Sequence, residues 1–415
     1  MAGSDPAVGF ERVDEGVTAR RLHLVGWLAL AVGALCIFAV TGKLLSDANW
    51  IPHFGQDFSA SWMAATLSLE GRPEAAFDVP LFAGLEQRLF GHSDTLLWHY
   101  PPTYLTLVSP LGALDFALAL IVFLAISLLV WFWAVSRMQP GLSVGLFSVV
   151  ALSGAAWMCA SQGQTGLLVG AALGAVLLAL RDNRPVVFAL ATAFLLIKPH
   201  FGLLIPLILV ASRRWDLFLW ATAACTAFLA AATFALGPDY WSAFFNNSDV
   251  LLGAQSGGDL WYQQISVFAG LAMLGVPLAA AIAVHSTVAL FAAGTVWIAW
   301  RAPDTPWQLR GAVFLIATLM MSPYAFHYDI VALSLALLLM AQDGLRRGFL
   351  PGERVLGAAL WFAPLYHWPL AYYAGIPLVP PLLIAALWIV WRRHRHLQTA
   401  SGVATAAFGA PQTAA

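Results

Sequence analysis

Apolar residues recur in long runs along this chain, and short polar segments separate each run from the next. A helix needs about 20 apolar residues to cross a bilayer, because it rises about 1.5 Å per residue through a hydrocarbon layer about 30 Å thick. The pattern therefore predicts an all-α membrane protein, a polytopic helical bundle of about 12 transmembrane segments. The clearest runs cover residues 22–42, 114–136, 142–160, 165–180, 216–236, 277–300, 311–322 and 330–342, and two further helices complete the bundle.

The segment 185–212 allows two interpretations. It is either one long helix with Lys198 near its centre, or two short helices, 185–197 and 200–212, that meet outside at Lys198-Pro199-His200. A single helix inverts every later loop and places pairs of arginines outside, against the positive-inside rule. Proline also lacks the amide hydrogen that a continuous helix requires. Both arguments favour the hairpin.

Charge follows the same alternation of sides. When the chain changes sides at each crossing, sixteen of its twenty Lys and Arg residues fall on one side, including Arg137, Arg213, Arg214 and Arg346. The positive-inside rule makes that side cytoplasmic. The polar residues on the other side then form a candidate reaction or substrate site, because titratable groups at one face of an apolar protein are costly and usually functional.

Long polar segments are expected on the outer side. The first outer loop runs from about 43 to 112, and residues 83–90 within it have the spacing of a short amphipathic interfacial helix. A second outer loop covers 238–262, and residues 263–275 form a re-entrant or interfacial segment.

Three regions follow from this threading. Residues 1–21 form a cytoplasmic tail, 22–395 the transmembrane domain, and 396–415 a disordered cytoplasmic tail of small residues. The run 22–42 is longer than the apolar part of a signal peptide, so we expect it to stay as the first helix.

Composition supports this class of protein. Hydrophobic residues make up 60% and charged residues 10% of the chain, against roughly 25% charged in soluble domains. Nucleic-acid binding has no support, since no basic patch carries interleaved aromatic residues. The three cysteines, Cys36, Cys159 and Cys225, fall in apolar runs and are typical of small core residues rather than a disulfide framework.

Asp57 and the run His99-Tyr100-Pro101-Pro102 are candidates in the first outer loop. Asp57 is either a solvated loop residue or a carboxylate at the interface that is basic enough to accept a proton from a sugar hydroxyl. His99 is a candidate phosphate ligand when protonated. Tyr100 is either a residue of the interfacial aromatic belt or part of a substrate site, and the two prolines start the next helix.

Gln162 and Gln164 flank a glycine at an outer turn, where amides either cap helix ends or hydrogen-bond sugar hydroxyls. Lys198 needs an anionic partner or a water-filled cavity at membrane depth, unless it extends to the interface. A lipid phosphate is one such partner.

The segment Ser322-Pro323-Tyr324 precedes His327 and Asp329. Asp329 is either a helix N-cap or a site residue, and Tyr324 is a candidate substrate contact. His327 is either an aromatic-belt residue, a phosphate ligand or a proton shuttle. No HxxxH or HExxH spacing supports a metal site, so no metal is assigned.

Five motifs and their order along the chain resemble glycosyltransferase family 87. They are Asp57, the His99-Tyr100-Pro101-Pro102 run, the Gln162/Gln164 turn, Lys198-Pro199 and the His327 region. The resemblance implies a GT-C fold and an extracytoplasmic active site in a bacterial inner membrane. It implies transfer of a hexose, expected to be mannose, from a polyprenyl-phosphate donor to a lipid or glycan acceptor. Asp57 matches the catalytic base of such enzymes, and Lys198 and His327 match positions near the donor phosphate.

A flippase for lipid-linked sugars or a small-molecule transporter is the main alternative. Transporters place ionisable groups near the bilayer midplane and commonly contain repeats. Here most polar groups lie at one face under a long loop, which favours an enzyme. A non-catalytic scaffold gives no reason for Lys198 at membrane depth.

Overall fold

The computed structural model describes residues 54–91, 97–138, 144–247 and 260–408, together with Leu24 and Trp27. The expected N-terminal tail 1–21, most of the expected first helix 22–42 and Cys36 lie outside these ranges. The described chain is helical throughout, apart from turns and isolated bridge residues, of which Gln264 and Phe326 form an antiparallel pair. The expected all-α class is confirmed for this part of the chain.

Several helices are suited to a bilayer by length and composition. Four long ones qualify among the described residues: α5 (Phe116–Met138), α11 (Trp215–Leu236), α15 (Leu278–Arg301) and the segment His327–Arg347, which joins η7 (His327–Ile330) to α17 (Val331–Arg347). Shorter apolar helices include α8 (Gly166–Arg181) and α16 (Trp307–Met321). The protein is thus a polytopic helical membrane protein, although these elements account for only part of the expected twelve spans.

The hairpin interpretation of 185–212 is confirmed. Its first arm joins α9 (Pro185–Phe194) to η4 (Leu195–Ile197), and its second arm joins η5 (Pro199–Gly202) to α10 (Leu204–Ala211). The chain breaks at Lys198, whose φ of −139° and ψ of 77° are not helical. The Arg214 guanidinium donates a 2.6 Å hydrogen bond to Asn183 Oδ1, so the ends of the two arms that are distant from Lys198 lie side by side.

The run 142–160 was wrongly expected to be one helix. It divides into α6 (Val144–Ala151) and α7 (Gly154–Gln162). Ser153 lies between them as the N-cap of α7, and its hydroxyl accepts from the Ala156 amide at 3.4 Å. Serine at an N-cap competes with continued helix, because its side chain satisfies an otherwise unpaired amide.

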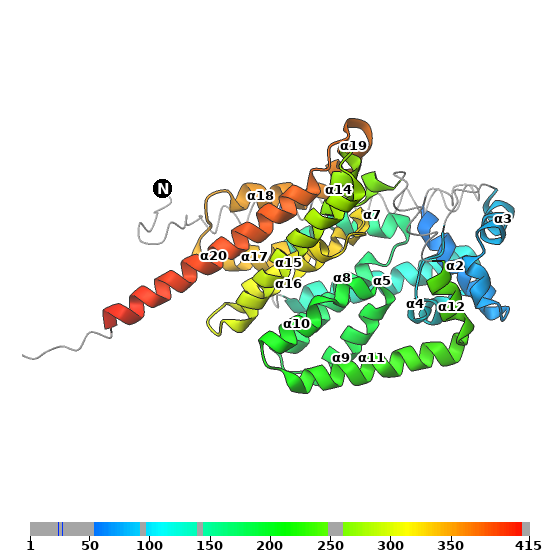
Figure 1. Ribbon diagram of the computed structural model, residues 1–415, viewed down its shortest axis with the longest axis horizontal. Helices are drawn as coiled ribbons and strands as arrows, with labels where there is room; N and C mark the ends of the chain where they lie inside the picture. The colour runs from blue at the N-terminus through cyan, green and yellow to red at the C-terminus, as the bar shows by residue number, and fades with distance from the viewer. Residues whose placement is uncertain are drawn as a thin grey trace, which may run out of the picture.

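Much of the first outer loop is also helical. It contains α2 (Gln56–Leu69), η2 (Pro73–Phe77), α3 (Val79–Phe90), α4 (Pro102–Val108) and η3 (Ser109–Ala113). Helix α3 includes the predicted helix 83–90 and begins earlier, at the N-cap Asp78. The second outer loop contains α12 (Asp239–Asn246) and most of η6 (Trp261–Gln263), and the segment 263–275, expected to be re-entrant or interfacial, contains α14 (Val267–Met273). Helices α2, α3, α4 and α12 gather at one end of the molecule, on the right in Figure 1.

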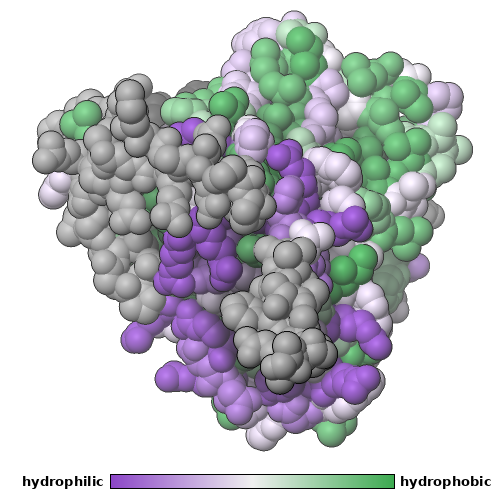
Figure 2. Space-filling view, turned by 90° about the vertical axis from the view of Figure 1, so that its left-hand side faces the viewer, coloured by the Kyte–Doolittle hydropathy of each residue, from purple (hydrophilic) through white to green (hydrophobic). Residues whose placement is uncertain are grey.

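Basic residues gather at the opposite end. There Arg393 of α20 (Val379–Phe408) is buried between two carboxylates, Asp343 and Glu353, each 2.6 Å away. Figure 2 looks onto this end and shows hydrophilic residues concentrated there. Helices α18 (Glu353–Trp361) and α19 (Ala363–Ala374) connect it back to the outer end.

Helix α20 also differs from the expected disordered tail that starts at residue 396. It continues as helix to Phe408. The segment is rich in alanine, the strongest helix former, and contains no proline before Pro411. Residues 409–415 lie outside the described ranges.

Candidate active site

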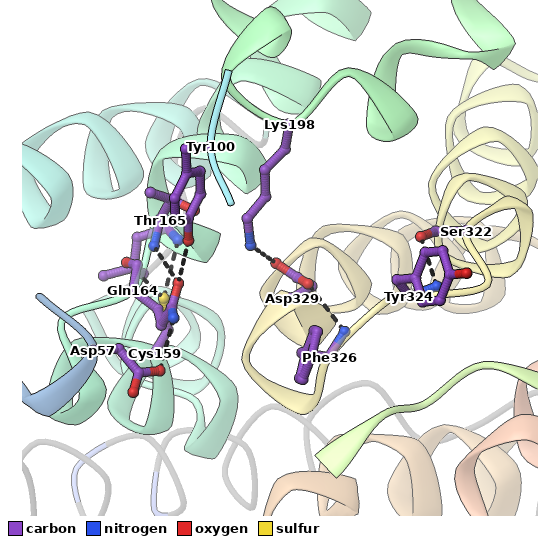
Figure 3. Close-up of polar contacts among 11 residues, drawn as sticks. Asp57, Tyr100, Cys159, Gln164, Thr165, Lys198, Ser322, Tyr324, Phe326 and Asp329 are labelled. Carbon is purple, nitrogen blue, oxygen red and sulfur yellow. Dashed lines mark hydrogen bonds and ion pairs between the residues drawn. The ribbon is translucent and has the colours of Figure 1, made fainter. Parts of the chain in front are cut away.

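A chain of hydrogen bonds holds Asp57 in the first turn of α2. The Gln164 amide donates to Asp57 Oδ2 at 2.7 Å, and the Tyr100 hydroxyl donates to Gln164 Oε1 at 3.2 Å. Figure 3 shows these three side chains side by side, although they come from three separate parts of the chain. Gln164 thus bridges a residue of the first outer loop and the aromatic run that begins at Trp98.

The turn between α7 and α8 explains how Gln164 reaches α2. Gly163 has a φ of 70°, a left-handed conformation that glycine adopts without strain. A Cβ at Gly163 would lie 2.6 Å from the Phe58 Cβ, so only glycine fits against α2 here. The Gly55 amide also donates to the Ser161 carbonyl at 2.7 Å, which fixes the start of α2 on the end of α7.

Lys198 and Asp329 form a buried ion pair. The Lys198 Nζ lies 2.8 Å from Asp329 Oδ1, and the two side chains are 7% and 1% exposed. The Tyr328 ring lies 4.7 Å from the same ammonium. The anionic partner expected for Lys198 is therefore present within the chain.

Asp329 also has the N-cap role considered for it. Its second oxygen, Oδ2, accepts from the Phe326 amide at 3.1 Å at the start of η7. In Figure 3 the Lys198–Asp329 pair faces the group of Tyr100, Gln164 and Asp57.

His327 lies in a second hydrogen-bond chain, built from the other amide of the turn. Its Nε2 is 2.9 Å from Gln162 Nε2, and its Nδ1 is 2.9 Å from the Gln263 carbonyl oxygen. The side chain is only 2% exposed. Gln162 and Gln164, two residues apart, thus turn to different partners across Gly163.

Tyr100 is held in place from the second outer loop. The Tyr240 hydroxyl donates to the Tyr100 carbonyl at 3.0 Å and accepts from the Trp98 indole at 2.7 Å. The His99 ring stacks on the Tyr100 ring at 4.5 Å, with Nδ1 3.0 Å from the Leu97 carbonyl. Burial lowers the pKa of His99, and this outweighs the contact with Leu97, which raises it.

The carboxyl group of Asp57 is more basic than an ordinary aspartate. Burial raises its pKa above 3.8, while the Gln164 hydrogen bond and the positive charge of Lys198 lower it by smaller amounts. A carboxylate with a raised pKa is a better proton acceptor near neutral pH.

Tyr324 stands apart from these residues. Its ring is half-buried against Phe268, with centroids 6.2 Å apart, and Figure 3 shows it on the far side of Asp329 from Asp57. The other candidates fall into three groups, and His99 stacks on one of them through Tyr100. The groups are the hydrogen-bond chain of Asp57, Gln164 and Tyr100, the chain of Gln162 and His327, and the ion pair of Lys198 and Asp329.

Sequence reasoning missed three supports of the site: Tyr240, Tyr328 and the Gln263 carbonyl. A tyrosine next to Asp329 was a visible signal for a cation–π contact with Lys198. Nothing in the sequence indicated the other two, because a backbone carbonyl has no signature and Tyr240 lies in a loop far along the chain.

Two cysteines fall in described ranges and are free. Cys159 is buried beside the turn, where its thiol donates to the Gln164 carbonyl at 3.2 Å, and Cys225 is half-buried. In the same ranges, no three His, Cys, Asp or Glu side chains are grouped closely enough to hold a metal ion.

Comparison with known proteins gives one family. The profile of glycosyltransferase family 87 matches residues 98–323, more than half of the chain. The matched range includes Tyr100, Gln164 and Lys198, while Asp57 precedes it and His327 follows it. No curated protein and no solved structure matches the chain. With its apolar spans and this match, the chain belongs to glycosyltransferase family 87 and is an integral multi-pass membrane glycosyltransferase.

Proposed function

We propose that the protein transfers a hexose from a polyprenyl-phosphate donor to an acceptor in a bacterial cell envelope, with inversion at the anomeric carbon. The acceptor is a lipid or glycan. The fold is of the GT-C type, and the active site faces the extracytoplasmic side of the inner membrane. Mannose is the sugar that the family resemblance favours.

The observation that carries the proposal is the placement of Asp57. Gln164 holds its carboxylate at 2.7 Å, and this group faces the Lys198–Asp329 pair. A proton acceptor on one side and a cation on the other are the two elements that transfer from a phosphate donor needs. A glycosidase instead places two carboxyl groups across the scissile bond.

The chemistry follows from these positions. Asp57 accepts the proton of an acceptor hydroxyl, whose oxygen attacks the anomeric carbon of the donor sugar. The bond from that carbon to the phosphate oxygen breaks, and its electron pair leaves on the polyprenyl phosphate. Phosphate is a weak base, so it needs no proton from a general acid.

Lys198 stabilises the charge that develops on the phosphate. An ammonium carries three donors, and one of them is directed at Asp329 Oδ1, so the others remain for phosphate oxygens. His327 lies beside this position. The Leu97 carbonyl accepts a hydrogen bond from His99 Nδ1, so in the neutral ring Nε2 is an acceptor and suits a hydroxyl group rather than a phosphate oxygen. Tyr100 and Asp329 orient the two sides of the site.

The transporter alternative loses its main support through family membership, since the family consists of transferases.

Transfer of label from radiolabelled polyprenyl-phosphate sugars to membrane extracts tests the proposal, with purified wild type beside Asp57→Asn. Removal of a general base is expected to slow transfer by about 10²- to 10⁴-fold while donor binding persists. Asp78→Asn is the matched control, because Asp78 is an exposed helix cap in the same outer region and asparagine also caps. Near-normal transfer by Asp57→Asn would exclude Asp57 as the base.

A further inference from the structure

The hydrogen bonds of His327 fix which of its ring nitrogens carries the proton. A backbone carbonyl can only accept, so Nδ1, at 2.9 Å from the Gln263 oxygen, must be the donor. In the neutral ring Nε2 is then an acceptor. The Gln162 amide, 2.9 Å away, must direct its NH₂ group toward Nε2.

This orientation leaves the other end of the Gln162 amide without a partner. Its oxygen, Oε1, is buried and accepts no hydrogen bond from any described residue. Reversing the amide does not help, because Oε1 would then face the lone pair of Nε2. The hydrogen bond to His327 therefore fixes the Gln162 amide with its Oε1 as an unpaired acceptor.

A second unpaired side chain lies at the other edge of His327. His367, from α19, is 1% exposed, and its ring centroid is 6.4 Å from that of His327. Neither of its ring nitrogens has a hydrogen-bond partner within the described ranges. The Gln263 carbonyl lies near it, and besides accepting from His327 it has a second lone pair for one His367 nitrogen. His367 thus keeps at least one ring nitrogen for a ligand.

We propose that Gln162 and His367 bind hydroxyl groups of the donor sugar, an inference that rests on the function proposed above. Buried polar atoms without partners cost stability, so a group from outside the protein is expected to pair with them. Helices α7 and α19 pack against each other and against η7, which brings the two side chains to the same place.

The chemistry of these groups selects the ligand. A sugar hydroxyl both donates and accepts, so it can pair with a free amide oxygen and with an imidazole nitrogen. Both side chains are neutral, so they suit a neutral polyol rather than a phosphate. Lys198 is the cation of the site, and it lies with Asp329 at the C-terminal end of the same η7 segment.

The test separates recognition of the sugar from recognition of the phosphate lipid. Equilibrium binding to the purified protein is measured for polyprenyl phosphate and for polyprenyl-phosphate mannose, glucose and galactose. The variants are Gln162→Leu and His367→Phe, which remove polar atoms and keep much of the volume. Gln342→Leu and His285→Phe are matched controls, since both residues are buried in helices and neither contacts His327.

Each variant is expected to weaken binding of the preferred sugar donor by about 5- to 100-fold, and to leave binding of polyprenyl phosphate unchanged. The controls keep both affinities. Equal weakening of both ligands, no weakening of either, or a loss confined to the acceptor KM would overturn the proposal. A wild-type protein that transfers sugar but binds all four lipids equally would also overturn it, with the proposed function intact. Absence of transfer from every donor would instead overturn the proposed function.

Discussion

The buried pair of Lys198 and Asp329 gives the sharpest prediction about stability. Its atoms are 2.8 Å apart and its side chains are 7% and 1% exposed, so removal of one partner leaves a charge with little access to water. Breaking such a pair costs about 3–5 kcal/mol, whereas replacing both charges together is often neutral or stabilising.

Lys198→Met keeps the aliphatic stem of the side chain, and Asp329→Asn keeps an oxygen that can accept from the Phe326 amide. We therefore expect each single variant to lower the free energy of unfolding by about 3–5 kcal/mol. The double variant should be more stable than either single one, because no unpaired charge remains.

Denaturant titration in detergent micelles, followed by tryptophan fluorescence, measures the three variants against wild type. Additive losses in the double variant would refute the reasoning, because they would mean that the two residues do not interact. The same proteins also separate two roles of Lys198. If it stabilises the leaving phosphate, the double variant regains stability but not transfer activity.

Four further predictions concern Asp57, with two of them, Gly163 and Arg393. The pH–rate profile should rise along a limb with a midpoint above 3.8, since burial raises the pKa of Asp57. Gln164→Leu should move that midpoint higher, because it removes a hydrogen bond that lowers the pKa. A midpoint that does not move in this variant would contradict the prediction. Because a raised pKa means that the fold disfavours the charged form, Asp57→Asn should not lower thermal stability at pH 7. Gly163→Ala should reduce both stability and transfer, whereas Gly202→Ala, with its nearest atom 4.0 Å away, should be tolerated in both measurements. Arg393→Met should lower the free energy of unfolding by about 3–5 kcal/mol, because it leaves two buried carboxylates without their cation. The kcat/KM of the folded fraction should stay unchanged. A change in kcat/KM would show that the Arg393 cluster is coupled to the candidate active site.

Local patterns were enough to predict many of the elements. The positions of α5, α8, α11 and α15 follow from runs of apolar residues, and the break at Lys198 follows from a proline and from the sides on which the arginines fall. The break at Ser153 was not predicted, because one serine in an apolar run gives a weaker signal than a proline.

The sequence did not predict which residues pair with each other in the site. Lys198 and Asp329 are 131 residues apart, and Asp57 and Gln164 are 107 apart. The types of these residues indicated that each needed a partner, but only the packing of the helices decides which. His367 was missed altogether, since a single histidine between aromatic residues has the appearance of an ordinary interfacial residue.

The short arms of the hairpin have a consequence for the lipid around the protein. Each arm, Pro185–Ile197 and Pro199–Ala211, has 13 residues and so rises only about 20 Å, against about 30 Å of hydrocarbon. Leu190 of α9 is 63% exposed, so one face of this arm is open to acyl chains while the other packs against α8 and α11. The bilayer must thin beside it or let water reach the hairpin tip. If the donor is a polyprenyl phosphate, as proposed, its head group is expected to sink below its usual level in the membrane to reach Lys198 at the hairpin tip.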